Sequence, residues 1–135
     1  MKLAPELAPA TEKQVVQVCC GRFLLAGWHP VRTEANNVGR GRLKNGKPRP
    51  GALPKGFPDY LFTKGLGNGL GLVAYVEFKN AAGGKLSLDQ KLTHQNLRQN
   101  YGQEVYVVTC IEQAEEIIRL GQKIESLLKA EEAAP

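Results

Sequence analysis

The 135-residue chain has few of the residues that would define a metal-thiolate, a disulfide-bonded or a membrane protein. Its three cysteines form no C-x-x-C pair, so a zinc site is not expected and at least one thiol stays free. Its two histidines are too few for a histidine-based nuclease site. No apolar run approaches the ~20 residues of a membrane span, and the first residues lack the apolar core of a signal peptide. These absences favour a soluble, cytoplasmic protein with reduced thiols and no membrane partner.

Basic charge is concentrated in one segment. The net charge is +5, but residues 112–135 hold six glutamates against three basic residues. Residues 34–56, the basic loop, have five glycines, three prolines and one acidic residue, with no regular periodicity. Loops of this length are usually functional or disordered, and their cations can neutralise phosphates without reading base sequence. The basic loop is therefore interpreted either as a surface that binds nucleic acid or as a solvated loop without a partner. The residues that would bind DNA are Arg40, Arg42, Lys44, Lys47, Arg49 and Lys55.

Local patterns predict seven elements in one domain. Residues 1–10, rich in Ala and Pro, are expected to form a flexible tail before a domain over 11–135. A crossover helix before the fourth strand predicts an α/β fold, with a mixed sheet flanked by helices. The expected elements are a helix over 11–27, strands over 28–33, 58–62 and 72–79, a helix over 87–102, a strand over 103–109 and a helix over 111–132.

Apolar residues predict which surfaces are buried. The apolar run over 103–109 predicts a buried strand, whereas Pro30 restricts the first strand to a sheet edge. Cys19 and Cys20 lie in an apolar helical pattern and are expected to be largely buried. The last helix has one apolar stripe, expected to face the core, which consists of Ile117, Leu120, Ile124, Leu127 and Leu128.

The third strand carries charged residues at its end. Because strand side chains alternate between faces, Glu77 and Lys79 share one face and Phe78 lies on the other. A glutamate at the end of an apolar strand needs a partner, which Lys79 or a bound cation would supply. A strand-end salt bridge is the simplest interpretation of an isolated E-x-K. The preceding segment "TKGLGNGLG", residues 63–71, is expected to connect a hairpin that returns Asp59 to a position beside Glu77.

Two converging carboxylates would repel unless one is protonated or a cation lies between them. Oxygen ligands of this kind, with room for water and phosphate oxygens, suit Mg²⁺ or Mn²⁺. A lysine two residues after Glu77 could orient the attacking water and offset charge on the phosphate. The glycines of 65–71 do not match a nucleotide-binding motif, and a strand rather than a helix follows them. The pattern therefore predicts phosphodiester hydrolysis and not a phosphate cradle.

Three short motifs in order resemble a known nuclease family. They are "GFPDYLF", then "YVEFKN" with its glutamate eighteen residues after the aspartate, then "GGKLSLDQ" at the start of a helix. Together with "EVYVVT", they resemble the VRR-NUC (virus-type replication-repair nuclease) domain of the PD-(D/E)xK superfamily, over residues 11–118. The resemblance implies a restriction-endonuclease-like αβββαβ core, to which this chain adds a C-terminal helix. It also implies a Mg²⁺- or Mn²⁺-dependent endodeoxyribonuclease of phage or mobile-element type, active in DNA repair on branched DNA such as Holliday junctions, as a homodimer.

The same resemblance assigns roles to individual residues. It implies that Asp59 and Glu77 bind the metal, together with the backbone carbonyl of Phe78. Lys79 would be the catalytic lysine. Gln90 would face the site from the following helix.

Each remaining assignment has a structural alternative. The family places an acidic residue on its first helix near the metal; Glu12 is the best match and Glu6 the alternative. Glu12 could instead only complement the helix dipole, and Gln90 could only close a capping box with Ser87. His94 lies one turn after Gln90 and so could face the site, but a lone histidine on a helix is usually a polar surface residue, and that is expected here. For the whole chain, the alternatives are a catalytically inactive nucleic-acid-binding module and a protein-interaction domain that uses the acidic last helix.

Overall fold

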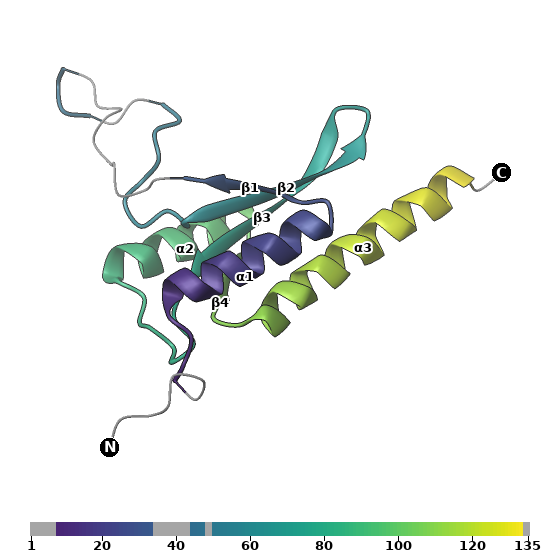
Figure 1. The fold of residues 1–135 in the computed structure, drawn as a ribbon. Coiled ribbons are helices and arrows are strands. Elements are labelled where there is room, and N and C mark those ends of the chain that lie inside the picture. The colour runs from purple at the N-terminus through teal and green to yellow at the C-terminus, as the bar shows by residue number, and fades with distance from the viewer. Residues whose placement is uncertain (1–7, 34–43, 48–49, 134–135) are drawn as a thin grey trace.

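The chain folds into seven elements, seen in a computed structural model that describes residues 8–33, 44–47 and 50–133 (Figure 1). Their order is the one that the sequence predicts. No helix in these described ranges is long and apolar enough to cross a membrane. The elements are α1 (Glu12–Leu25), β1 (His29–Arg32), β2 (Tyr60–Gly67), β3 (Leu70–Phe78), α2 (Leu88–Tyr101), β4 (Val105–Val108) and α3 (Ile111–Ala133).

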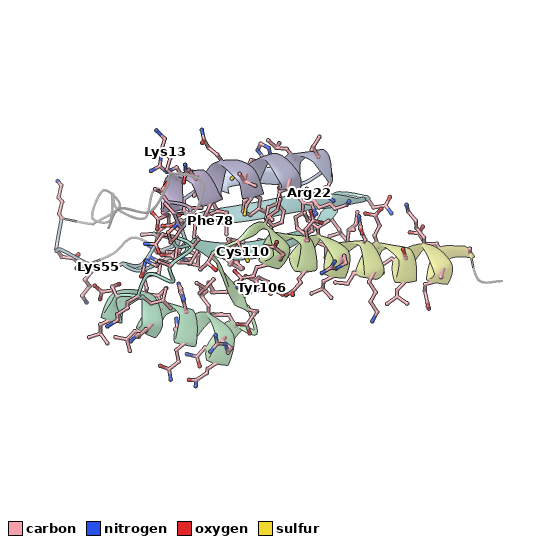
Figure 2. The ribbon with its side chains drawn as sticks, turned by 60° about the horizontal axis from the view of Figure 1, so that its bottom comes forward. Lys13, Arg22, Lys55, Phe78, Tyr106 and Cys110 are labelled. Atoms are coloured by element: carbon pink, nitrogen blue, oxygen red, sulfur yellow. The ribbon has the colours of Figure 1, made fainter. Side chains whose placement is uncertain are left out.

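The four strands form one mixed sheet in the order β1-β2-β3-β4. The first three strands run antiparallel in succession, and β4 returns parallel to β3 after the crossover through α2. Figure 2 shows α1 and α2 on opposite sides of the sheet, and Figure 1 shows α3 running beside α1. The protein is therefore an α/β structure in which helices cover both faces of the sheet, as predicted.

The β2–β3 hairpin turns at Asn68 and Gly69, which both have positive φ, 56° and 79°. An Asn-Gly pair is the preferred sequence for such a two-residue turn. The strands reach further than expected, because only these two residues separate them. Gly71 is required within β3, since a Cβ there would lie 2.8 Å from the Lys64 carbonyl oxygen. The glycine-rich segment is thus a hairpin, as predicted, although most of it is strand.

The apolar core lies between the sheet and the pair of helices α1 and α3. The Phe23 ring stacks on Phe62 of β2 with centroids 4.0 Å apart, and it meets Trp28 edge-on at 5.8 Å. Cys19 is fully buried there as a free thiol, and Cys20 is half-buried. The core is completed by Val15, Ala74, Val76, Phe78, Val108, Ala114, Ile117 and Ile118.

Two packing predictions were wrong in part. Strand β4 lies at a sheet edge and not inside the sheet, so Val107 keeps 36% of its surface exposed. On α3, Ile117 is buried but Leu120, Leu127 and Leu128 are exposed, with Leu127 at 62%. Figure 1 shows the C-terminal half of α3 running out beside the β2–β3 hairpin, beyond the apolar core, and Glu125 on this half lies 3.4 Å from Lys64 of β2.

Gly121 of α3 packs against Trp28 in the core. The glycine is buried, and a Cβ there would lie 2.5 Å from Cζ2 of Trp28, an impossible separation for carbon atoms. Gly21 of α1 is exposed, and a Cβ on it would meet nothing within 4 Å. The two helical glycines therefore differ in what an added methyl group would meet.

We expect Gly121→Ala to destabilise the fold by about 1–3 kcal/mol, because the methyl group overpacks the core against Trp28. The matched Gly21→Ala should be neutral or stabilise by roughly 0.5–1 kcal/mol, since alanine favours the helix and nothing is displaced. Urea unfolding followed by circular dichroism measures both. Equal free energies of unfolding for the two variants would contradict this packing.

Candidate active site

A buried carboxylate lies at the end of the sheet where β3 finishes. Glu77 is fully buried, and its side chain points to the face covered by α2, opposite the core face of its neighbour Phe78. Asp59 directly precedes β2, and the register that pairs Tyr60 with Val76 brings Asp59 beside Glu77. The Asp59 backbone N–H donates a hydrogen bond to Glu77 Oε2 at 3.0 Å. The predicted meeting of Asp59 and Glu77 is therefore present.

The Glu77 carboxyl is held in an environment that disfavours its charge. Burial, and next the negative charge of Asp59, raise its pKa to about 7, from an ordinary 4.5. The hydrogen bond from the Asp59 N–H and the charge of Lys79 act in the opposite direction but do not compensate. A divalent cation between the Asp59 and Glu77 carboxyl groups would stabilise their ionised forms, because it would offset the repulsion between the two negative charges.

Lys79 and Gln90 complete the group around Glu77. The Gln90 Nε2 amide donates to Glu77 Oε1, and its Oε1 accepts from Lys79 Nζ at 3.3 Å. Lys79 Nζ lies 3.8 Å from Glu77 Oε1. The Lys79 backbone is fixed as well, since its N–H donates to the Val108 carbonyl of β4 at 3.0 Å. The lysine is thus directed toward the carboxylates and away from open solvent.

Gln90 also closes the capping box of α2. Its Oε1 accepts from the Ser87 N–H at 2.8 Å, while the Ser87 hydroxyl accepts from the Gln90 N–H at 3.1 Å. The two interpretations of this glutamine are therefore not exclusive. Helix capping fixes its side chain, and the fixed amide then bonds Glu77.

The chain that leads to Asp59 is clamped onto α2. The Thr93 hydroxyl donates to the Lys55 carbonyl at 2.6 Å, and Lys55 Nζ lies 3.2 Å from Asp89. Gly56 has a φ of +82°, and a Cβ on it would lie 2.3 Å from the Asp89 backbone. The segment can approach the helix this closely only because glycine stands at 56. This contact fixes Asp59 relative to Gln90.

Glu12, the best match for the acidic residue of the first helix, does not join the group. Glu12 is exposed in the first turn of α1, and Glu6 lies outside the described residues. The start of α1 does come near the end of β3, because the Ala81 N–H donates to the Ala10 carbonyl at 2.9 Å. Ala10 also packs against the core. Within the described ranges, no three His, Cys, Asp or Glu side chains are grouped so as to hold a metal ion.

The structure describes Phe78, the remaining predicted metal ligand, and part of the basic loop. Phe78 ends β3, so its backbone carbonyl lies at the end of the strand beside Glu77. Lys44, Lys47 and Lys55 are exposed, and Figure 2 shows Lys55 near the start of α2. The other predicted DNA-binding residues, Arg40, Arg42 and Arg49, lie outside the described residues.

His94 was wrongly expected at the surface. It is only 5% exposed, and its Nε2 has no hydrogen-bond partner among the described residues. The spacing of four from Gln90 already placed it on the site-facing side of α2. Sequence could not show the burial, because that depends on how closely the segment before Asp59 packs on the helix.

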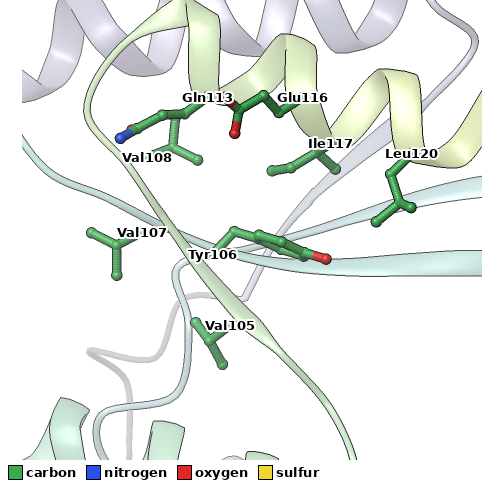
Figure 3. Close-up of a pocket in the computed structure, with 8 residues that line it drawn as sticks. All are labelled: Val105, Tyr106, Val107, Val108, Gln113, Glu116, Ile117 and Leu120. Atoms are coloured by element: carbon green, nitrogen blue, oxygen red, sulfur yellow. The ribbon is translucent and has the colours of Figure 1, made fainter.

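A groove elsewhere on the molecule has a different character. It has a volume of about 400 Å³ and lies between β4 and α3 (Figure 3). Figure 3 shows Glu116, Ile117 and Leu120 of α3 pointing toward β4, which carries Tyr106. Its described lining has one carboxylate, Glu116, and no lysine. It therefore lacks the paired acids and the cation that hydrolysis at a phosphate needs.

Ionisation of Glu77 should destabilise the metal-free protein as the pH rises. Its folded pKa of about 7 lies above the ordinary value of 4.5, so the unfolded chain releases its proton first. Stability is then lost between about pH 4.5 and 7 and changes no further above that range. Glu77→Gln has no such loss. In EDTA, we expect the melting temperature of this variant, relative to wild type, to rise on the order of 5 °C between pH 5 and pH 8.

Differential scanning fluorimetry at several pH values measures this difference. Glu12→Gln, which removes an exposed carboxyl, is the control and should keep a constant offset from wild type. A constant offset for Glu77→Gln as well would show that the Glu77 carboxyl does not carry a raised pKa.

Known proteins add no further assignment to this site. Comparisons of the chain with models of protein families, with curated proteins and with solved structures found no match. The indications of a function are therefore the chemistry of Asp59, Glu77, Lys79 and Gln90 and the order of the motifs that carry them.

Proposed function

We propose that the protein is a metal-dependent DNA endonuclease of the VRR-NUC type, within the PD-(D/E)xK superfamily. The observation that carries the proposal is the convergence of Asp59, Glu77, Lys79 and Gln90 at one end of the sheet. The element order, with three antiparallel strands and a parallel fourth strand after a helix, is consistent with a restriction-endonuclease-like core. A salt bridge alone would explain Lys79 but not a second carboxyl group beside Glu77.

The donor set fits Mg²⁺ or Mn²⁺. Mg²⁺ is commonly held by one or two carboxylates and completes its shell with waters and substrate phosphates, so a third acidic residue such as Glu12 is not required. Asp59 and Glu77 would supply these carboxylates, with the Phe78 carbonyl as a further oxygen. The raised pKa of Glu77 supports this assignment, since a cation would relieve the repulsion from Asp59. The bound ion would polarise the phosphate and lower the pKa of a water molecule.

Lys79 and Gln90 would act on the substrate side of this centre. The Lys79 ammonium is within reach of Glu77, so a phosphate bound at the carboxylates would lie beside it. There it donates hydrogen bonds to a non-bridging phosphate oxygen, or to the attacking water, and stabilises charge in the transition state. Gln90 holds both Lys79 and Glu77 in orientation through its two amide atoms.

The basic loop would bind the DNA backbone next to the site. Its last residues are clamped on α2 through the Lys55 carbonyl and Gly56, a few residues before Asp59. Phosphates held along Lys44, Lys47 and Lys55 would therefore lead toward the carboxylates. Contacts of this kind fix the position of a duplex without reading its sequence.

The preferred substrate follows from the family resemblance. Such a stand-alone domain, of phage or mobile-element type, would act in DNA repair on branched DNA such as a Holliday junction. One domain presents one such site, so paired incisions in two strands require two copies, and a homodimer matches the symmetry of a junction.

Removing the Lys79 ammonium should lower the cleavage rate roughly 100- to 1,000-fold, because transition-state charge loses its donor. The test incubates wild type, Lys79→Ala and the control Lys123→Ala with supercoiled, linear and four-way-junction DNA, in Mg²⁺, Mn²⁺ or EDTA. Wild type and Lys123→Ala should cleave only with metal. No metal-dependent cleavage by wild type, or equal cleavage by Lys79→Ala, would contradict the proposal. Binding without cleavage would favour a nucleic-acid-binding module, and no binding a protein-interaction domain.

Basic residues of the loop should set the salt dependence of DNA binding. In a Lys79→Ala background, Lys44→Gln combined with Lys47→Gln should reduce the slope of log K against log salt by about 2. The control pair, Lys123→Gln with Lys129→Gln on α3, makes the same change in charge and should leave the slope unchanged. Fluorescence anisotropy with labelled duplex measures both. Equal slopes for the two pairs would remove the basic loop from the DNA-binding surface.

A further inference from the structure

His94 is a buried polar group without a partner. The side chain is 95% buried on α2, and Nε2 makes no hydrogen bond with any described residue. Leaving such a nitrogen unpaired in the interior lowers stability, a cost that a surface histidine would not incur. An apolar residue would fill the same space at no such cost. The histidine therefore indicates a hydrogen-bond partner that joins the site from outside the chain or moves into reach.

His94 lies on the side of α2 that contacts Glu77 at the end of the sheet. It lies one turn after Gln90, whose amide bonds Glu77, so the two side chains share one face of the helix. Its neighbour Thr93 fastens this turn to the Lys55 carbonyl. The clamp holds this turn of α2 against the segment that leads into Asp59.

Charged groups around the ring come from α2, from the segment before β2 and from the end of β3. Burial lowers the pKa of His94, and the charges of Arg98 and Lys79 lower it further, whereas Asp59 opposes them. The ring is accordingly neutral near pH 7 and has one N–H to donate. Of Arg98, Lys79 and Asp59, only Asp59 can accept a hydrogen bond from this N–H.

We propose that His94 is a positioning residue for the metal site, with its Nε2–H donating to the Asp59 carboxylate, directly or through one water, when the carboxylates hold a divalent cation. This inference rests on the proposed function. A carboxylate that ligates a metal commonly accepts a second hydrogen bond that fixes its orientation. The Asp59 backbone N–H donates to Glu77, and the His94 ring would give the Asp59 carboxylate a donor from α2 once a cation lies between the two carboxylates.

The test measures Mn²⁺ affinity by isothermal titration calorimetry with wild type, His94→Phe and His94→Gln. His94→Phe fills the space without a donor and should weaken binding about 10- to 100-fold. His94→Gln keeps an N–H and should recover most of the affinity. His29→Phe, at the exposed second histidine, is the control and should bind as wild type does.

Melting temperatures in EDTA separate positioning from a structural role. The metal-free His94→Phe should melt at or above the wild-type temperature, because it removes an unpaired polar group from the interior. Unchanged Mn²⁺ affinity of His94→Phe, or a loss of affinity that parallels a lower melting temperature, would overturn the inference and leave the nuclease proposal intact. Failure of wild type to bind Mn²⁺ would overturn both.

Discussion

The buried carboxylate of Glu77 is the group on which this arrangement depends. A carboxylate without water around it must find hydrogen-bond donors or positive charge, or remain protonated. Three separate parts of the chain provide these contacts to Glu77. The Asp59 N–H before β2 and the Gln90 amide on α2 donate hydrogen bonds, and the Lys79 ammonium after β3 supplies positive charge. The buried Glu77 carboxyl group therefore links the ends of β2 and β3 to the start of α2.

Stability and proposed function use the same contacts here. Gln90 caps α2 and bonds Glu77, so the helix start and the site share one side chain. Gly56 lets the segment before Asp59 lie against the backbone of α2. This close packing fixes the position of Asp59 relative to Gln90. The acid pair is held together although burial and mutual repulsion both oppose ionisation of Glu77. Groups kept close against their own repulsion are typical of sites that bind a cation or perform acid–base chemistry.

The fold was largely predictable because its signals are local. Thr11 and Ser87 begin capping boxes, Asn68 and Gly69 form the hairpin turn, and Pro30 lies in an edge strand. Strand alternation alone placed Glu77 and Lys79 on one face, and the hairpin brought Asp59 opposite. Each of these features is determined by residues close together in the sequence and by a single hairpin turn.

The features that sequence missed depend on distant packing. The apolar run of β4 looks the same whether a fifth strand covers it or not, so its edge position could not be read. Leu127 and Leu128 continue the stripe of α3 beyond the last residue that the core covers. The burial of His94 arises because Gly56 and Thr93 bring another segment over the helix. The exposure of Glu12 likewise depends on how α1 is rotated on the sheet.

A crystal of the protein soaked in Mn²⁺, with anomalous scattering used to locate the ion, tests the metal site most directly. We expect one Mn²⁺ between Asp59 and Glu77, with an oxygen of each carboxylate about 2.1 Å away and Lys79 beside it. Anomalous density only elsewhere, or Asp59 and Glu77 carboxylates more than about 6 Å apart, too far to share one cation, would contradict this expectation.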